Sequence, residues 1–349
     1  MFRAAAALIV SLVLGGCQRA AGPAGPPDTG PTLVEGTHQV MGSELRIGIW
    51  TSAGSTARSA MDEAFRRADG LDELLSVWKP GSPVVAINAA AGDHPVPAGP
   101  EVRDVLHRAA QFSEWTGGKF DVTFGVLSGL WKFDAQNEDD KLPDMAEVRR
   151  RLPLIDYRQI EIDDAAGTVF LKRRGMSVHL GGVGKGYAVD QVATILRRAG
   201  LNDFLVQFGG DMYAAGHRDS RPWKLGIRDP RGPEDRIFAS VDLSDATFST
   251  SGDYERFFMA NGRRYHHLID PTTGEPARGA RSVTIVAREA VDADALSTGV
   301  FLMGAVEGMA LVERLPGVEA VIVSDRNEVL VSSGLKGLVT LVAQPTDAP

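Results

Sequence analysis

Hydrophobic positions along the chain repeat with a strand period in some segments and a helical period in others. Between residues 34 and 50 apolar residues alternate with others, which predicts two short strands around Met41-Gly42-Ser43. Between residues 61 and 75 apolar residues recur three and four positions apart with charged residues between them, the pattern of an amphipathic helix. A second helix of this kind is predicted to begin near Pro100 and to end before Gly117-Gly118.

Strand and helix patterns continue through the rest of the chain without a regular alternation. This irregular order favours an α+β fold, with mixed helices and antiparallel-rich sheets, over a doubly wound parallel sheet. The predicted strands are 159–162 and 168–171 around a turn at 163–167, then 204–207, 224–227, 282–286, and a final hairpin of 320–323 with 329–332. The glycine-rich run Gly181 to Gly186 is predicted to open a helix that ends at Gly200, and two further helices are predicted at 293–303 and 305–315.

The first sixteen residues have the layout of a signal peptide, with one basic residue before an apolar stretch at 4–14. This stretch is shorter than the roughly 20 residues of a permanent membrane-spanning helix. The run Leu14-Gly15-Gly16-Cys17 resembles a bacterial lipobox, in which the cysteine becomes the acylated first residue; an ordinary secreted protein is the alternative. We therefore expect a lipoprotein signal peptide at 1–16, a flexible tether at 17–31, and a lipid anchor through Cys17 on the periplasmic side of the inner membrane.

We divide the remaining chain into a domain at 32–343 and a tail at 344–349. Its composition and charge exclude some classes of function. The chain is 44% hydrophobic, which suffices for one large domain or two packed lobes. The formal net charge is −8, and no basic cluster is interleaved with aromatic residues, so nucleic-acid binding has no electrostatic support. A single cysteine excludes an intramolecular disulfide and a zinc knuckle.

A glycine-rich run from Gly181 to Gly186 precedes a predicted helix, whose first amide groups could face an anion such as phosphate. The run is not a Walker A loop, because His179 stands where that loop needs glycine and Gly186 stands where it needs Ser or Thr. Tight helix packing explains the glycines equally well.

Adjacent histidines, His266 and His267, lie four and three residues before Asp270 in a second polar segment. One would by default be a surface residue and the other a satisfied core residue. A nearby carboxylate could instead orient an imidazole as a base. Adjacent strand residues point to opposite faces, which disfavours a two-histidine metal site.

Oxygen-bearing side chains gather at the start of the helix predicted near residue 293. Asp294 and Thr298 are four residues apart and so share a helix face, with Asp292 just before them. Spacing alone favours a helix N-cap, while the same atoms would also suit a hard cation such as magnesium. The polar run 250–256 is predicted to be a turn leading to an edge strand.

Taken in order, these motifs resemble the FAD:protein FMN transferase family, known as ApbE and formerly called thiamine-biosynthesis lipoproteins. The resemblance extends over nearly the whole mature chain. Its parts are Met41-Gly42-Ser43, Leu75 to Trp78, Gly118 to Thr123, Gly181 to Asp190, Phe208 to Asp211, Thr250 to Arg256, His267 to Pro276 and Ala293 to Thr298.

The resemblance implies that FAD lies extended in a cleft between two packed lobes, with Mg²⁺ beside its pyrophosphate. The residues that match metal ligands are the side chains of Asp294 and Thr298 and the backbone carbonyl of Gly182. The family usually has aspartate where this chain has His179, so the contacts of that aspartate do not transfer directly. The positions that match cofactor contacts are Met41, Trp78, Lys119, Phe120, Asp121, His179, Lys185, Leu268 and Ser297.

The implied reaction is the attack of a threonine or serine hydroxyl of an acceptor protein on the FMN phosphorus of FAD, with departure of AMP. His267 matches the candidate base, and Asp270 is a candidate to orient it. The implied acceptors are flavoprotein subunits of membrane redox complexes: sodium-pumping NADH:quinone oxidoreductase (Nqr), the Rnf complex, or a nitrous-oxide reductase maturation protein. The alternatives are an FAD pyrophosphatase with water as acceptor and a non-catalytic flavin-binding lipoprotein.

Overall fold

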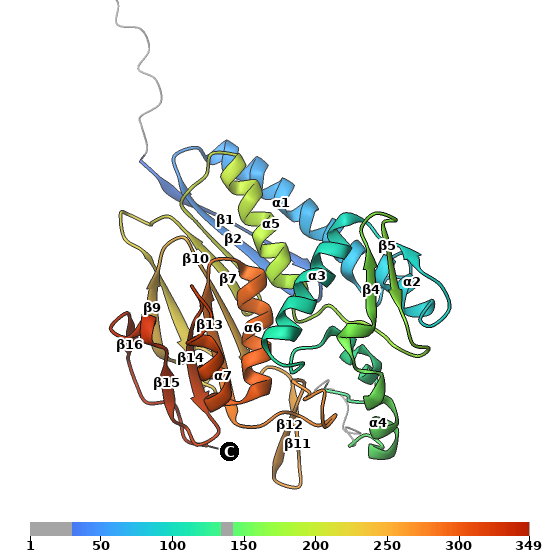
Figure 1. Cartoon of the computed structure of the whole chain (residues 1–349). Coiled ribbons are helices and arrows are strands. Elements are labelled where there is room, and N and C mark those ends of the chain that lie inside the picture. Colours follow the sequence, from blue (N-terminus) through green and yellow to red (C-terminus); the bar gives the residue numbers. More distant parts are fainter. Residues whose placement is uncertain (1–29, 134–141, 349) are drawn as a thin grey trace, which may run out of the picture. The chain divides into compact units, whose positions relative to one another are not determined.

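An antiparallel sheet of eight strands runs through the centre of the fold, with every neighbouring pair antiparallel (Figure 1). The computed structural model describes residues 30–133 and 142–348, and its described residues from Pro31 onward form one compact unit. The strands, in their order across the sheet, are β1 (Thr32–Val40), β2 (Ser43–Thr51), β6 (Phe204–Phe208), β7 (Asp211–Ala215), β10 (Ala246–Gly252), β13 (Ala280–Ala287), β14 (Glu319–Ser324) and β15 (Val329–Val331).

Helices cover one face of this sheet. The apolar side of α1 packs on β1 and β2, as its helical spacing predicts, and α6 packs on β10 and β13. Every residue of β13 is buried, because α6 covers one face of the strand and a second sheet covers the other. The helices of this layer are α1 (Gly54–Leu75), α5 (Gly184–Arg198), α6 (Ala290–Met303) and α7 (Ala305–Val312).

A smaller three-stranded sheet packs against the opposite face of the central sheet. Its apolar side chains, including Trp223 and Phe238, form a second core with Phe248 and Val323 of the large sheet. The strands of this sheet are β16 (Val339–Leu341), β9 (Ile237–Leu243) and β8 (Trp223–Arg228).

The remaining elements lie beside the helical layer and carry several of the candidate site residues. In the β11–β12 hairpin, the rings of Phe258 and Tyr265 stack with their centroids 5.3 Å apart. The ring of Tyr265 also stacks on that of Trp131, with centroids 6.0 Å apart. These elements are α2 (Pro83–Ala89), α3 (Pro100–Trp115), α4 (Met145–Arg151), the 3-10 helices η1 (Val122–Leu127), η2 (Leu152–Leu154) and η3 (Tyr157–Gln159), the small sheet β3 (Val96–Pro97), β5 (Thr168–Leu171) and β4 (Ile160–Asp163), and the hairpin β11 (Phe257–Ala260) and β12 (Arg263–His266). A further 3-10 helix, η4 (Ser333–Leu335), follows β15, and its Leu335 lies in the second core.

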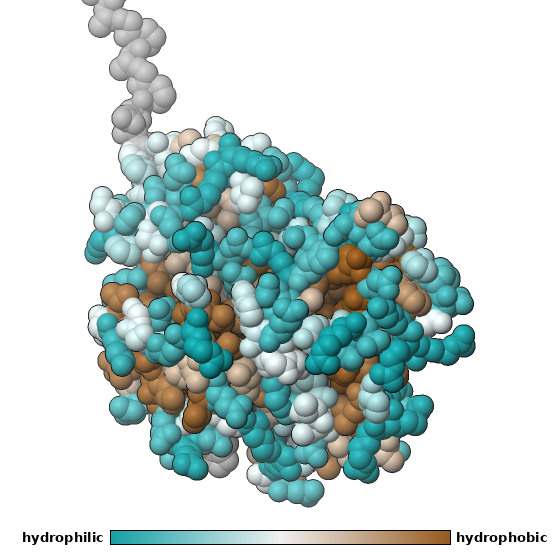
Figure 2. Space-filling view, viewed as in Figure 1, coloured by the Kyte–Doolittle hydropathy of each residue, from teal (hydrophilic) through white to brown (hydrophobic). Residues whose placement is uncertain are grey.

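Apolar residues also reach the surface on the face drawn in Figure 2, over the region where Figure 1 places α7 and strands β14 to β16. Val306 of α7 is 79% exposed, and Leu341 of β16 is 50% exposed. In the described part of the chain, no helix combines the length and the apolar character needed to span a membrane.

The α+β prediction is confirmed, and so are the predicted strands and helices, with ends that differ by a few residues. The prediction for 250–256 is wrong in one respect: Thr250 belongs to β10, an interior strand between β7 and β13. The predictions for 1–16, most of the tether and Cys17 fall outside the described residues.

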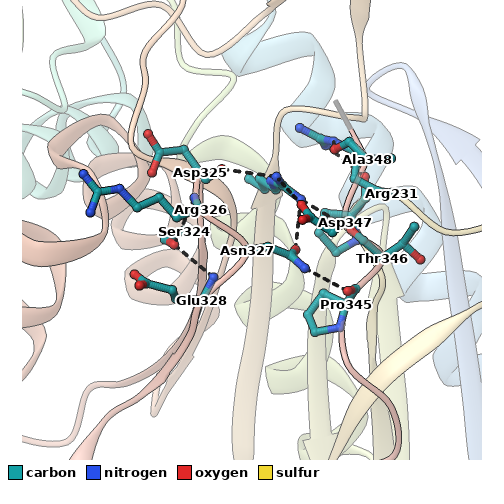
Figure 3. A network of polar contacts seen from close by, with 12 residues as sticks. Arg231, Ser324, Asp325, Arg326, Asn327, Glu328, Pro345, Thr346, Asp347 and Ala348 are labelled. Atoms are coloured by element: carbon teal, nitrogen blue, oxygen red, sulfur yellow. Dashed lines mark hydrogen bonds and ion pairs between the residues drawn. The ribbon is translucent and has the colours of Figure 1, made fainter.

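The segment 344–349, expected to be a tail, makes specific contacts through residue 348. Figure 3 shows Thr346 and Asp347 beside Arg231 and the turn around Asn327. Thr346 donates through its backbone N and its Oγ1 to the fully buried Asp229, at 3.0 and 2.7 Å from Oδ2. The end of the chain is thus held by the loop that follows β8.

Candidate active site

The glycine run brings the start of α5 directly against α6. The backbone N of Gly186 donates to Oδ2 of Asp294 over 2.9 Å. A Cβ at position 186 would lie 2.3 Å from the carbonyl oxygen of Ala290 and 2.7 Å from Cβ of Asp294. Only glycine fits at this crossing. Gly186 therefore allows the two helices to pack closely and also donates a hydrogen bond to a site residue.

Two buried carboxylates share one ammonium group beside this crossing. Lys185 forms an ion pair with Asp211, the first residue of β7, and its Nζ lies 4.0 Å from Oδ1 of Asp294. Asp211 and Asp294 are 2% and 4% exposed. Burial, followed by the charge of Asp211, raises the pKa of Asp294 to about 7. Burial alone would lower the pKa of Lys185, but the charges of Asp211 and Asp294 outweigh it and raise that pKa.

Hydroxyl groups from β10 and α6 form a connected set next to the carboxylates. Ser251 Oγ lies 2.8 Å from Ser297 Oγ and 3.2 Å from Thr298 Oγ1, and Ser249 Oγ donates to Asp211 Oδ1 over 2.5 Å. This set depends on β10 being an interior strand, which the sequence did not indicate.

Gly182 lies beside Thr298. A Cβ on Gly182 would lie 3.8 Å from Oγ1 of Thr298 and 3.2 Å from the ring of Phe120. The structure therefore brings the three predicted metal-ligating residues, Gly182, Asp294 and Thr298, to one place around the start of α5.

The start of α6 is capped from another helix, which corrects the N-cap interpretation of Asp294. Asp190 of α5 accepts hydrogen bonds from the backbone N of Ala290 at 2.8 Å and of Val291 at 2.9 Å. Asp294 stands one turn further along, where its carboxylate bonds to Gly186 instead. Sequence spacing could not reveal this, because the capping residue is 100 positions away.

The two histidines have different surroundings. Nε2 of His266 lies 3.0 Å from the carbonyl oxygen of Ala277, so His266 is a core residue with one ring nitrogen bonded, while its Nδ1 is buried without a hydrogen-bond partner in the described structure. Nδ1 of His267 is buried without a hydrogen-bond partner in the described structure. Burial, followed by the charge of Arg256, lowers the pKa of His267 to about 3, and Lys185 contributes in the same direction. His267 is therefore neutral at pH 7.

Asp270 contacts Lys119 rather than His267. Its Oδ2 accepts from Nζ of Lys119 over 2.8 Å, and its Oδ1 accepts from the backbone N of Thr272 over 2.9 Å. These contacts lower the pKa of Asp270 against the opposing effect of its burial. No hydrogen bond or ion pair joins Asp270 to His267, both of which are described, so the structure gives no support to the predicted orienting role.

Asp121 uses both carboxylate oxygens within the protein. Oδ1 accepts from the backbone N and Oγ1 of Thr123, at 2.8 and 2.6 Å, and Oδ2 accepts from the backbone N of Tyr157 at 2.9 Å. Burial raises its pKa. These bonds fix the segment that carries Lys119 and Phe120.

The other predicted cofactor residues lie around the glycine run. Cε of Met41 is 3.7 Å from the position of a Cβ on Gly184. Trp78 is 76% exposed, and its ring centroid is 6.4 Å from that of His179. Nδ1 of His179 accepts from the backbone N of Gly181 over 3.1 Å, a bond that an aspartate could also accept. Leu268 is buried in the main core.

The donor set has the chemistry of a hard-cation site. Within residues 30–133 and 142–348, no group of three or more His, Cys, Asp or Glu side chains could hold a metal ion, so a cation here would also need hydroxyl and carbonyl oxygens as ligands. Carboxylate, hydroxyl and carbonyl oxygens of Asp294, Thr298 and Gly182 would supply part of a coordination shell that Mg²⁺ usually completes with water and substrate phosphates.

A family model described as the ApbE family matches residues 41–322. The chain belongs to the ApbE family. Among curated relatives, the FAD:protein FMN transferase of Treponema pallidum is 33% identical over 312 residues, covering 85% of this chain and 86% of the relative. One from Klebsiella pneumoniae is 30% identical, with 87% of each chain covered.

Solved ApbE structures have the same fold. The ApbE protein of Thermotoga maritima superposes with a TM-score of 0.80 at 32% identity, covering 88% of this chain and 99% of its own. The flavin transferase ApbE of Vibrio cholerae gives a TM-score of 0.79 at 26% identity, covering 88% and 99%. All candidate residues except Cys17 lie within the matched ApbE region.

Sequence reasoning missed two acidic residues of this ApbE site, Asp211 and Asp190. Both stand in motifs that carried the resemblance, Phe208 to Asp211 and Gly181 to Asp190. Their position in these motifs could have marked both residues as candidates, but neither motif indicated which group the carboxylate contacts.

Proposed function

We propose that this chain transfers FMN from FAD to a threonine or serine hydroxyl of an acceptor protein, with AMP as the second product. The observation that carries the proposal is the convergence of the buried Asp294 with the partly exposed Thr298, Gly182 and Lys185 at the glycine-rich start of α5. A helix N-terminus and an ammonium group suit a diphosphate, and the oxygen donors suit its counter-ion. The names of the curated relatives support the coarser statement that FMN passes from FAD to a protein.

The residues fit Mg²⁺, which Asp294, Thr298 and the carbonyl of Gly182 would hold. When bound, the ion would supply neutralisation of the pyrophosphate and of the negative charge that develops on the leaving AMP. Lys185 would bind the same diphosphate as a point charge.

His267 would take the proton of the acceptor hydroxyl as its oxygen bonds to the FMN phosphorus and the bond to AMP breaks. Burial and Arg256 keep the imidazole neutral and so able to accept a proton. The diphosphate of FAD would counter the positive charges of Arg256 and Lys185, which raises the basicity of His267 when the substrate is bound.

The test is to incubate the full chain with FAD, Mg²⁺ and candidate acceptor domains, then search by mass spectrometry for FMN on threonine or serine. Free FMN with no adduct would indicate a pyrophosphatase, and unchanged FAD would indicate a binding protein. Asp294→Ala should lose both activity and metal binding; metal affinity equal to that of the wild type in calorimetry would exclude this ligand set.

For location and partners, we propose anchoring through Cys17 on the periplasmic side of the inner membrane, with acceptors of the Nqr, Rnf or nitrous-oxide reductase maturation type. The support is the leader sequence and the family resemblance. Membrane fractionation of Cys17→Ala tests the anchor, because the variant should leave the membrane fraction. A variant that remains membrane-bound would refute it.

A further inference from the structure

Asp211 has no role in the reaction as described, although it is one of the two buried carboxylates beside Lys185. Its Oδ1 accepts from Ser249 Oγ over 2.5 Å, and its Oδ2 forms the ion pair with Lys185. Asp211 is 2% exposed, so a lysine and a hydroxyl hold this carboxylate in the interior.

The same ammonium group lies near Asp294 without a direct hydrogen bond to it. The separation of 4.0 Å between Nζ and Oδ1 contrasts with the close contact to Asp211. Among the described residues, the backbone N of Gly186 is the one donor to the other oxygen of Asp294, Oδ2. When both carboxylates are ionised, they and the one ammonium leave one excess negative charge at this site, and that charge favours a cation.

We propose that Asp211 is a positioning residue that holds Lys185 away from Asp294 and so leaves Asp294 free to bind the divalent cation. The inference rests on the proposed function and extends it to a residue outside the ligand set. Without Asp211, Lys185 would be drawn onto Asp294, the remaining buried carboxylate within reach, and would compete with the metal.

The experiment measures binding of Mn²⁺, a spectroscopic probe for oxygen-ligand sites, to the full chain by the loss of the free-ion EPR signal. Asp211→Asn should weaken Mn²⁺ binding by about tenfold or more, a coupling in the usual range for linked sites. Asp211→Asn combined with Lys185→Met should recover affinity, because the competing ammonium is gone.

The double variant separates this role from two others. If Asp211 were itself a metal ligand, or if its loss simply disrupted the fold, removal of Lys185 would not restore binding, and the inference would be overturned. Asp245→Asn is the matched control, because it breaks the exposed pair of Asp245 with Arg197 and should leave Mn²⁺ affinity unchanged.

The outcomes also separate this inference from the proposed function. If the wild-type chain binds no Mn²⁺, the proposed metal site is refuted, and both proposals lose their basis. Wild-type binding with equal affinity in Asp211→Asn would overturn the inference about Asp211 and leave the proposed transfer intact.

Discussion

Lys119 and Asp270 are 151 positions apart and form an ion pair of 2.8 Å, which joins the segment after α3 to the turn after His267. The side chains are 29% and 16% exposed. The turn from Asp270 to Gly274 closes on the backbone of Asp270, with Gly274 N donating to its carbonyl oxygen over 2.8 Å. The pair therefore fixes one edge of the site.

This geometry predicts that Asp270→Asn lowers the rate of transfer only modestly, by at most about tenfold, because a partly exposed ion pair contributes little. Lys119→Met should have a similar effect, and the double variant should be no worse than either single variant. Transfer kinetics at saturating FAD measure this. A loss in Asp270→Asn as large as that in His267→Ala would instead assign Asp270 to the orientation of His267.

His267→Ala should reduce transfer by about 100-fold or more while FAD still binds, because general base catalysis contributes at least that factor. Single-turnover mass spectrometry measures the transfer, and FAD fluorescence measures binding. His266→Ala is not a suitable control, since His266 supports the core through Ala277. Retained transfer in His267→Ala would remove this residue from the mechanism.

Gly186→Ala should destabilise the protein by about 1–3 kcal/mol, the usual cost of overpacking, because a methyl group would press against Ala290 and Asp294. Metal binding should weaken as well, since the hydrogen bond from Gly186 to Asp294 would be displaced. Gly70→Ala in α1 is the matched control: apart from its chain neighbours and the backbone of its own helix, no atom of the described residues lies within 4 Å of its Cβ position, and it should be neutral or stabilising. Urea unfolding of both variants measures the change in the free energy of unfolding.

The raised pKa of Asp190 predicts that the stability of the protein depends on pH. Burial raises its pKa from 3.8 to about 7, although the hydrogen bonds from Ala290 and Val291 oppose the shift. The folded chain thus retains a proton that the unfolded chain loses, so the contribution of Asp190 to the free energy of unfolding falls as pH rises between these values. The slope from this group is at most about 1.4 kcal/mol per pH unit.

Asp190→Asn should remove this slope, so the stability of the variant relative to the wild type should increase between pH 5 and pH 8. Urea unfolding at both pH values measures it. Asp245→Asn provides the comparison, because the pKa of Asp245 is lowered and its substitution should not produce this increase. A relative stability of Asp190→Asn that does not change with pH would contradict the assignment.

The end of the chain should contribute to stability through one residue. Thr346→Val would remove the hydrogen bond from Oγ1 to the buried Asp229 and keep the one from the backbone N, at a cost of about 1–3 kcal/mol. Asp347→Ala is the matched change one residue away: its side chain is 78% exposed, and loss of its pair with Arg281 should cost less than about 1 kcal/mol. Equal unfolding midpoints for the two variants would show that the end of the chain is not anchored through Thr346.

Residue periodicity and turn chemistry in the sequence determined the main elements of the fold. The spacing of apolar residues between 61 and 75 places α1, and glycines mark where α3 and α5 begin or end. These signals are local, because each depends on neighbours within one or two turns of the chain. The ordered motifs likewise indicated the family and most of the candidate residues.

Only the tertiary structure decided which polar groups meet. It paired Asp270 with Lys119, capped α6 with Asp190, and placed Asp211 beside Lys185. It also made β10 an interior strand, which brings Ser251 to Thr298. Partners of this kind are 26 to 151 positions apart, and a carboxylate has the same local pattern whatever group it contacts, so the folded arrangement alone assigns each one.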